Sequence, residues 1–279
     1  MKDDSLKTKY PIMLVHGMGY RDYSLIPYWG RIPSVLEKGG ASVYYGHQDS
    51  HGSVYHNAIQ LRRSLLNILK ETGADKINII AHSKGGIDAR RMIVIPGIDE
   101  HIASLTTVST PHRGSKTVDL LFKYFKPAVN SICALSDLWF SFLGDELPNS
   151  KRAYYSLSKT FSKGFNEKIL NSPKVYYQSY ACQMRNAFSD PLLMIPFTFV
   201  KHIDGECDGL VAVKSARWGE FKGVVSSPGI RGVSHCDEID LRRSKIFFGS
   251  RKSDENFLTV DDITKLYIHI VSDLVKKGF

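Results

Sequence analysis

One segment constrains the fold of this chain more than any other, because a buried strand in it must turn abruptly into a helix. Residues 76–80 are an apolar run that predicts a buried strand, and the segment Ala81-His82-Ser83-Lys84-Gly85-Gly86 follows directly. Small residues at Ala81 and Gly85 let two backbones pass closely while Ser83 is exposed at the bend. The pattern is A-x-S-x-G rather than G-x-S-x-G, and its strand, turn and helix context indicates a nucleophile elbow.

Further short β-rich runs predict buried strands at residues 11–15, 42–45, 104–109, 175–180 and 221–225. An apolar stripe predicts a helix over 58–71, and a closing amphipathic helix is expected over 261–276. Strands that alternate with helices indicate an α/β fold, with a mostly parallel central sheet and helices on both faces. Such a sheet can use all 279 residues as a single domain, 1–279.

The apolar pattern changes between residues 116 and 163, where many aromatic and aliphatic residues fall outside the strand alternation. An inserted helical lid or cap at about 116–163 is one interpretation, and ordinary core helices are the other. Residues 191–200 form a second apolar stretch, which is either another lid element or a buried loop.

Composition excludes several classes of protein. Apolar residues make up 43% of the chain and charged residues 23%, as in soluble globular enzymes. The net charge of +9 is spread along the sequence, which favours a solvated basic surface over a nucleic-acid or anionic-membrane partner. No apolar run is long enough to span a bilayer, and the N-terminus shows no secretory signal. The four cysteines form no CxxC motif, but the sequence allows one disulfide between two of them.

Acyl transfer at Ser83 needs hydrogen-bond donors for the developing oxyanion. One donor in this fold is the backbone N–H after the nucleophile, here that of Lys84, and another comes from the loop after an early strand. The predicted strand 11–15 runs into His16-Gly17-Met18-Gly19, so the N–H of Met18 is the second candidate. The alternative is a glycine turn that only connects two elements.

The other members of a catalytic triad must follow in the order serine, acid, histidine. His235 lies in a polar loop just before the final helix and is favoured as the base over His202 and His269. Asp208, in a loop that enters a predicted strand, is favoured as the acid. Its rivals are Asp190 and Asp204.

Six segments in this order resemble the bacterial true-lipase family, particularly the clostridial and Bacillus-type triacylglycerol lipases and polyester-cleaving esterases. They are His16–Gly19, Tyr28-Trp29-Gly30, Ala81–Gly86, Ser109–Ser115, Asp208-Gly209-Leu210-Val211 and His235-x-Asp237-Glu238. The resemblance implies an α/β-hydrolase fold, a Ser83, Asp208 and His235 triad, and an oxyanion hole at Met18 and Lys84. It also implies carboxylic ester or lipid substrates, an oil–water interface, helical lid elements and secretion, with a cytoplasmic location as the alternative.

Triad chemistry does not choose the leaving group, so a thioesterase, amidase or acyltransferase is an alternative on the same fold. A non-catalytic binding protein with a hydrolase fold is another alternative. A metal-dependent hydrolase that uses His47, His51 and His56 is a third.

The family resemblance also implies two structural metal sites, although catalysis itself needs no cofactor. Asp237, two residues after the histidine, matches a calcium ligand, with Asp190 as its possible partner. Similarity to the Bacillus-type branch suggests His56 and Asp137 as zinc ligands, completed by His51 or His47. The alternatives are an ordinary loop carboxylate and surface histidines.

Overall fold

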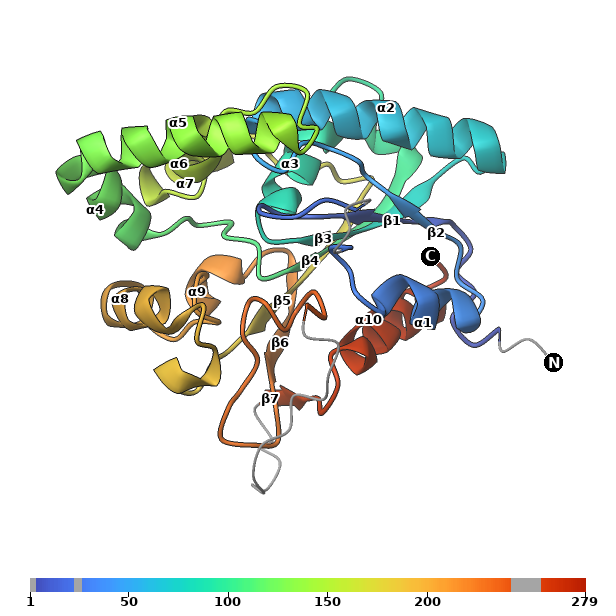
Figure 1. Cartoon of the computed structure of the whole chain (residues 1–279). Coiled ribbons are helices and arrows are strands. Elements are labelled where there is room, and N and C mark those ends of the chain that lie inside the picture. Colours follow the sequence, from blue (N-terminus) through green and yellow to red (C-terminus); the bar gives the residue numbers. More distant parts are fainter. Residues whose placement is uncertain (1–3, 23–26, 242–256) are drawn as a thin grey trace.

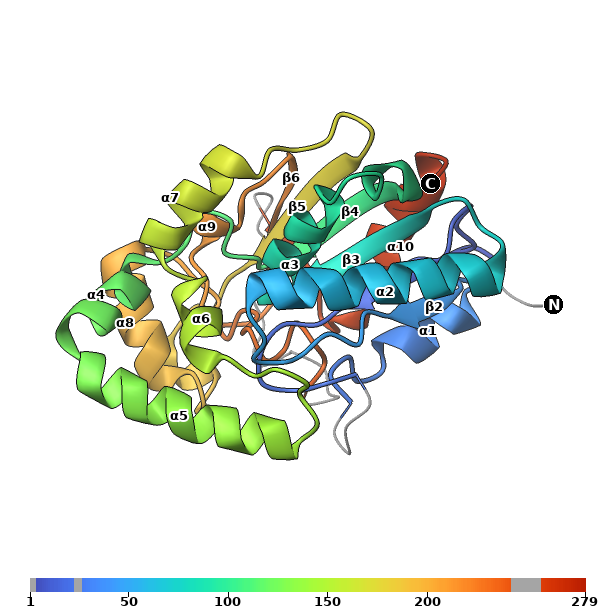
Figure 2. The ribbon, with the colours of Figure 1, turned by 90° about the horizontal axis from the view of Figure 1, so that it is seen from above.

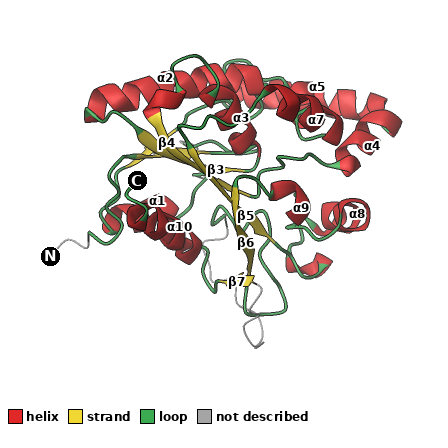
Figure 3. Ribbon diagram, turned by 180° about the vertical axis from the view of Figure 1, so that it is seen from behind, coloured by secondary structure: helices red, strands yellow, loops and turns green. Residues whose placement is uncertain are grey.

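Parallel strands form one sheet at the centre of the molecule (Figures 1 and 3). The computed structural model describes residues 4–22, 27–241 and 257–279. The seven strands lie in the order β2-β1-β3-β4-β5-β6-β7, and all neighbouring pairs are parallel. Their bounds are Ile12–Val15 (β1), Val43–Tyr45 (β2), Ile77–His82 (β3), Ile102–Val108 (β4), Tyr176–Cys182 (β5), Glu220–Ser226 (β6) and Phe257–Thr259 (β7). The predicted α/β sheet is confirmed.

Helices cover both faces of the sheet, with α2 and α3 on one face and α1 and α10 on the other (Figures 1 and 2). The described α-helices are Ile32–Lys38 (α1), Val54–Thr72 (α2), Lys84–Ile93 (α3), Lys116–Tyr124 (α4), Lys126–Phe142 (α5), Ser150–Tyr155 (α6), Lys159–Lys168 (α7), Met194–Asp204 (α8), Val213–Ala216 (α9) and Thr264–Lys276 (α10). Short 3₁₀ turns lie at Asp99–His101 (η1) and Ala187–Ser189 (η2).

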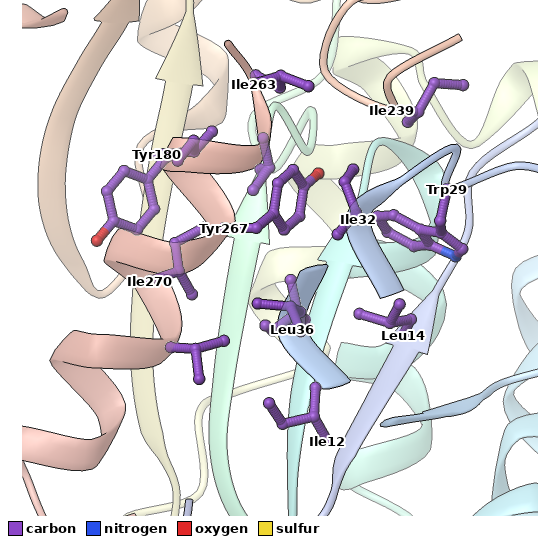
Figure 4. Packing of buried hydrophobic residues seen from close by; sticks show 14 of the residues in the cluster. Ile12, Leu14, Trp29, Ile32, Leu36, Tyr180, Ile239, Ile263, Tyr267 and Ile270 are labelled. Atoms are coloured by element: carbon purple, nitrogen blue, oxygen red, sulfur yellow. The ribbon is translucent and has the colours of Figure 1, made fainter. Parts of the chain in front are cut away.

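The hydrophobic core has two layers, one on each face of the sheet. Consecutive residues of a strand point to opposite faces, so Leu14 packs under α1 and α10 while Met13 packs under α2 and α3. On the α1 and α10 side, the rings of Trp29 and Tyr267 meet edge to face with centroids 6.0 Å apart (Figure 4). The Tyr267 hydroxyl also donates to the backbone oxygen of Glu238 at 2.9 Å, which ties α10 to the segment that carries His235.

All six strands predicted from the sequence are present, with ends shifted by one or two residues. The shift that matters most is in β3, which continues through His82 and so places Ser83 directly after the strand. The seventh strand, β7, was not predicted because a run of three residues carries little periodic signal. The helices predicted over 58–71 and 261–276 are α2 and α10.

The apolar region from 116 to 163 forms helices α4 to α6 and the start of α7, which lie between β4 and β5 in the chain and add no strand to the sheet. Helix α5 has 17 residues, of which only Cys133 is buried. Its apolar side chains are therefore largely exposed, and the expectation of ordinary core helices is wrong for α5.

The stretch 191–200 contributes the first part of helix α8, which buries Phe197 and Val200 and leaves Ile195 and Phe199 exposed. It is therefore a surface helix rather than the buried loop that was the alternative. All four cysteines are free, so the disulfide that the sequence allowed does not form in this structure. Among the described helices, we find none with both the length and the apolar character needed to cross a membrane.

Candidate active site

The turn between β3 and α3 places Ser83 in a backbone conformation that few residues adopt. Its φ is 53° and its ψ is −133°, outside the helical and extended regions. Glycine is required on the helical side, because a Cβ at Gly85 would collide with the backbone oxygen of His16, and one at Gly86 with Thr110 Oγ1. Ala81, which stands where glycine is usual, is fully buried within β3. Its methyl group is thus accommodated, and the elbow geometry forms.

The three side chains predicted to act together are in contact. The Oγ of Ser83 lies 3.0 Å from Nε2 of His235, and Nδ1 of His235 lies 2.8 Å from Oδ2 of Asp208. The other carboxylate oxygen of Asp208 accepts the backbone N–H groups of Leu210 (2.8 Å) and Val211 (2.7 Å). This arrangement gives His235 a proton on Nδ1 and leaves Nε2 free to accept the serine proton.

Asp208 is ionised by this environment. Its burial alone would raise the pKa of the carboxyl, but the charge of His235 and the hydrogen bond to it lower that pKa below the usual range. The backbone N–H of His235 also donates to the backbone oxygen of Asp208 at 2.9 Å, so the two loops are held together independently of their side chains.

The rival residues lie elsewhere. The carboxylate of Asp204 accepts the Ser115 hydroxyl and the backbone N–H groups of Lys116 and Thr117, so it caps α4. Exposed surfaces of α8 and α10 carry His202 and His269 respectively. Asp190 accepts the hydroxyl of Ser234, the residue before His235, at 2.7 Å.

The loop that carries Met18, the predicted second oxyanion donor, lies against Ser83. A Cβ at Gly17 would stand 2.8 Å from the Cβ of Ser83 and 2.7 Å from the hydroxyl of Tyr28, so only glycine fits between them. Met18 follows directly. Lys84 is the first residue of α3, where the backbone N–H has no partner within the helix and lies at the positive end of the helix dipole.

The side chain of Lys84 points away from this chemistry into the protein. It is 1% exposed, and its Nζ lies 2.8 and 2.9 Å from the two oxygens of Asp88. Asn57 donates to the same carboxylate at 2.8 Å. The predicted role of Lys84 therefore concerns only its backbone.

A buried chain of hydrogen bonds behind the triad was missed by sequence reasoning. Gly17 N–H donates to the Tyr28 hydroxyl (2.8 Å), which lies 2.7 Å from Nδ1 of His82, and Nε2 of His82 lies 2.7 Å from Oε2 of Glu238. Ser109 donates to the other oxygen of Glu238 at 2.9 Å. These hydrogen bonds link the loop of Gly17 and Met18 to Glu238, three positions after His235. A histidine inside the elbow and an acid after the base were the available signals.

Burial shifts the pKa values of two groups in this hydrogen-bonded chain. Burial and the neighbouring His235 lower the pKa of His82 well below its usual value, so its ring is neutral. Burial and the charge of Asp208 raise the pKa of Glu238 well above its usual value. Nδ1 of His235 lies 3.7 Å from Oε2 of Glu238, compared with 2.8 Å from Asp208. His235 thus faces one carboxyl with a lowered pKa, Asp208, and one with a raised pKa, Glu238.

The positions of these side chains limit where a metal ion could bind. Within the described part of the chain, one group of three or more His, Cys, Asp or Glu residues has its ligand atoms within 4.8 Å of one another, namely His82, His235 and Glu238. These atoms are the hydrogen-bonding groups of the triad and of the chain behind it. The expected zinc ligands are not brought together as such a group.

Each expected zinc ligand has another partner. His51 stacks on Phe140 with centroids 3.6 Å apart, and its burial lowers its pKa to about 3. His56 Nε2 lies 3.2 Å from Oδ2 of Asp49, and Asp137 accepts the backbone N–H of Ser150. His47 is half exposed. The interpretation of His51, His56 and Asp137 as one zinc site is therefore not supported by the geometry.

The carboxylates near His51 are used to fasten the end of α5. Asp49 accepts the backbone N–H groups of Glu146 (2.9 Å) and Leu147 (2.8 Å), and Asp145 accepts those of Ser50 (3.0 Å) and His51 (2.8 Å). Arg21 donates to Asp145 at 2.9 Å. A cation supplied by the chain itself, Arg21, thus offsets part of the charge of this acidic pair.

The expected calcium site also contains a cation of the protein. Nη1 of Arg231 lies 2.6 Å from Oδ2 of Asp237, and Nη2 lies 3.0 Å from Oδ1. Nε of Arg231 donates to the backbone oxygen of Ser189 at 2.8 Å. Both oxygens of Asp237 are therefore engaged by the guanidinium, and Asp237 with Asp190 does not fit a calcium ion in this arrangement.

Comparison with known proteins agrees with the fold and with ester hydrolysis. Residues 38–135 match the family described as PGAP1-like alpha/beta domain. Triacylglycerol lipase 2 of Saccharomyces cerevisiae is 30% identical over 272 residues, which cover 93% of this chain and 77% of that protein.

Two solved structures share the fold. A Bacillus licheniformis lipase in mature form gives a TM-score of 0.65 at 22% identity, covering 84% of this chain and 88% of that one. Lipase 1 from Pelosinus fermentans gives 0.64 at 17% identity, covering 96% and 98%. The chain therefore belongs to the bacterial-type triacylglycerol lipase family of α/β-hydrolases and is a carboxylic ester hydrolase.

Proposed function

We propose that Ser83, His235 and Asp208 are the catalytic triad of this hydrolase. The observation that carries the proposal is the continuous line from Ser83 Oγ to His235 Nε2 (3.0 Å) and from His235 Nδ1 to Asp208 (2.8 Å). These separations are within hydrogen-bonding distance, as proton transfer in an acyl-transfer reaction requires. The backbone N–H groups of Met18 and Lys84 are the proposed oxyanion donors.

In the first half-reaction, His235 takes the proton of Ser83 while the serine oxygen attacks the ester carbonyl. The tetrahedral oxyanion is stabilised by the two N–H groups, and His235 then gives its proton to the leaving alcohol. In the second half, His235 takes a proton from water, the hydroxide attacks the acyl-serine, and the carboxylic acid leaves as Ser83 regains its proton. Every proton moves between protein, substrate and water.

We propose lipid esters as the substrate class, with triacylglycerols as the first candidates, following the name of the yeast relative. The exposed apolar side chains of α5 and α8 support this choice because a lipid surface can cover them. In this proposal α4 to α7 form the lid, the segment 116–163 lies at an oil–water interface, and the whole chain acts as one domain. The reciprocal bonds of Asp49 and Asp145 fix one end of that lid.

The deciding experiment compares Ser83→Ala with Ser34→Ala, which changes an exposed serine on α1. A fluorophosphonate probe should label the parent and Ser34→Ala and leave Ser83→Ala unlabelled. Hydrolysis of p-nitrophenyl esters should fall by at least 10⁴-fold only in Ser83→Ala. Labelling of Ser83→Ala would place the nucleophile elsewhere.

A second panel sets the substrate class. Esters of rising acyl length are compared with matched thioesters and amides, with and without an emulsified phase. A lipase hydrolyses long-chain esters faster above the solubility limit of the substrate. Equal or faster cleavage of thioesters or amides would favour the alternative reactions on this fold.

A further inference from the structure

Many of the exposed aromatic and aliphatic side chains gather at one end of the molecule. They lie on α4, α5 and α8, which Figures 1 and 2 show together on the side away from both termini. Among them, Tyr124 is 63% exposed, Phe125 59%, Leu135 70%, Ile195 65% and Phe199 57%. Exposed apolar side chains that gather on one surface in this way indicate a binding partner.

The helices that carry these residues are fastened to one another. Asp204, at the end of α8, accepts the Ser115 hydroxyl at 2.7 Å and the backbone N–H of Thr117 at 3.0 Å. These bonds join the end of α8 to the start of α4, and α4 packs along α8. The corner between α4 and α5 and the outer face of α8 therefore belong to one supported surface.

The corner is basic as well as apolar. Its sequence is Phe122-Lys123-Tyr124-Phe125-Lys126-Pro127, and no acidic residue occurs between Asp119 and Asp137. Both lysines are exposed. The two acids that border this segment are half-buried and bonded to other helices, because Asp119 accepts the backbone N–H of Lys159 and Asp137 accepts that of Ser150. The local charge at the corner is thus positive.

This combination fits one kind of partner better than others. Protein interfaces are depleted in lysine at their centre, whereas here two lysines bracket two exposed aromatic residues, Tyr124 and Phe125. A neutral oil surface would cover the apolar side chains but would gain nothing from the lysines. An anionic phospholipid bilayer takes both, because aromatic rings enter the headgroup boundary while lysine side chains reach the phosphates.

We propose that the α4–α5 corner, together with the outer face of α8, docks this enzyme on anionic phospholipid bilayers. Phe125 and Tyr124 enter the boundary between headgroups and acyl chains, and Lys123 and Lys126 contact the lipid phosphates. The docking goes beyond ester hydrolysis and does not depend on the proposed triad.

The test measures binding without catalysis by using the full chain with Ser83→Ala. Sedimentation with vesicles of phosphatidylcholine alone is compared with vesicles that contain 30 mol% phosphatidylglycerol, at 50 and 500 mM NaCl. We expect the partition coefficient to rise at least tenfold with the anionic lipid and to fall at high salt. Lys123→Gln with Lys126→Gln should lose about 30-fold, since each lysine near an anionic surface contributes about fivefold.

A matched control removes the same charge at the other end of the molecule. Lys38→Gln with Lys70→Gln, at exposed positions of α1 and α2, should keep most of the binding. Phe125→Ser should weaken binding to both kinds of vesicle. With Ser83 present, the Lys123 and Lys126 variant should hydrolyse a soluble short-chain ester like the parent, which separates a failure of docking from a failure of the triad.

Three results would overturn the proposal. The first is equal partition onto neutral and anionic vesicles, and the second is an equal loss in the control pair. The third is a dimer in size-exclusion chromatography that Phe125→Ser converts to a monomer, with no vesicle binding by the parent, because a second copy of the chain would then cover this surface.

Discussion

Arg231 and Asp237 form a two-bond ion pair in the loop that carries the proposed catalytic base, with Nη1 to Oδ2 at 2.6 Å and Nη2 to Oδ1 at 3.0 Å. Both side chains are at least nine-tenths buried. The same carboxylate accepts the backbone N–H of Ser234 at 3.0 Å, so the ion pair braces the residue before His235. The guanidinium of Arg231 thus binds the carboxylate that the family resemblance assigned to calcium.

The first prediction concerns metal removal. Activity of the parent enzyme should not change on incubation with a calcium chelator, because Arg231 is covalently part of the chain. Arg231→Ala should lose about 3–5 kcal/mol of stability, since it leaves the Asp237 carboxylate buried without its partner. Millimolar calcium should then restore part of the melting temperature, because the oxygens of Asp237 and Asp190 become available to a cation.

A surface ion pair provides the control for this experiment. Arg63 donates to Glu146 at 2.8 Å, but both side chains are more than half exposed, so Arg63→Ala should cost less than about 1 kcal/mol. It should show no response to calcium. Chelator-sensitive activity in the parent would show that the ion pair does not replace a metal.

The second prediction concerns Lys84. Although its backbone is the proposed oxyanion donor, Lys84→Ala should destabilise the protein by about 3–5 kcal/mol because Asp88 would remain buried and unpaired. Lys84→Met combined with Asp88→Asn removes both charges and should recover most of that loss, with a kcat near that of the parent. Urea denaturation and ester hydrolysis on the same samples measure the two effects. A well-folded double variant as inactive as Ser83→Ala would make the lysine side chain a participant in the reaction.

Much of the fold could be predicted because its signals are local. Buried parallel strands are continuous apolar runs, and six of them were identified within one or two residues. The chain order Ser83, Asp208, His235 follows from the fold. In the structure His235 lies within 3.0 Å of both Ser83 and Asp208. Each of these inferences needed only a short window or a chain order.

What could not be predicted depends on residues that meet from distant positions. His82 and Glu238 are 156 residues apart, and nothing local to either one shows that they share a hydrogen bond. The same holds for the zinc hypothesis, since Arg21 and Asp145, 124 residues apart, meet beside His51. Arg231 is only six residues before Asp237, but its direction depends on how the loop folds back on itself.

The third prediction uses the raised pKa of Glu238. In the folded protein this carboxyl stays protonated above its ordinary value of 4.5, whereas in the unfolded chain it ionises near that value. Above pH 4.5 the folded state therefore binds more protons than the unfolded state, and the free energy of unfolding decreases as pH rises. Glu238→Gln has no such proton, so the stability of the variant relative to the parent should increase from pH 5 to pH 8.

Urea midpoints of both proteins across this range give the slope, which can reach about 1.4 kcal/mol per pH unit. Glu146→Gln is the control. A hydrogen bond from Arg63 lowers the pKa of the exposed Glu146. The stability difference between Glu146→Gln and the parent should therefore change with pH only below about pH 5 and stay constant above it. Parallel pH curves for the parent and Glu238→Gln would mean that Glu238 is ionised in the folded protein.

The last prediction tests how closely the oxyanion loop approaches the nucleophile. A methyl group at Gly17 would press on the Cβ of Ser83 at 2.8 Å and on the Tyr28 hydroxyl at 2.7 Å, so Gly17→Ala must displace the loop that presents Met18. Because loss of one oxyanion donor costs about 10²- to 10³-fold in kcat, we expect a decrease of that size with a smaller change in KM. Gly164→Ala is the matched control: a Cβ there meets no atom within 4 Å, and alanine in helix α7 should stabilise the protein by about 0.5–1 kcal/mol without changing kcat. Full activity in Gly17→Ala would remove the loop of Met18 from the oxyanion hole.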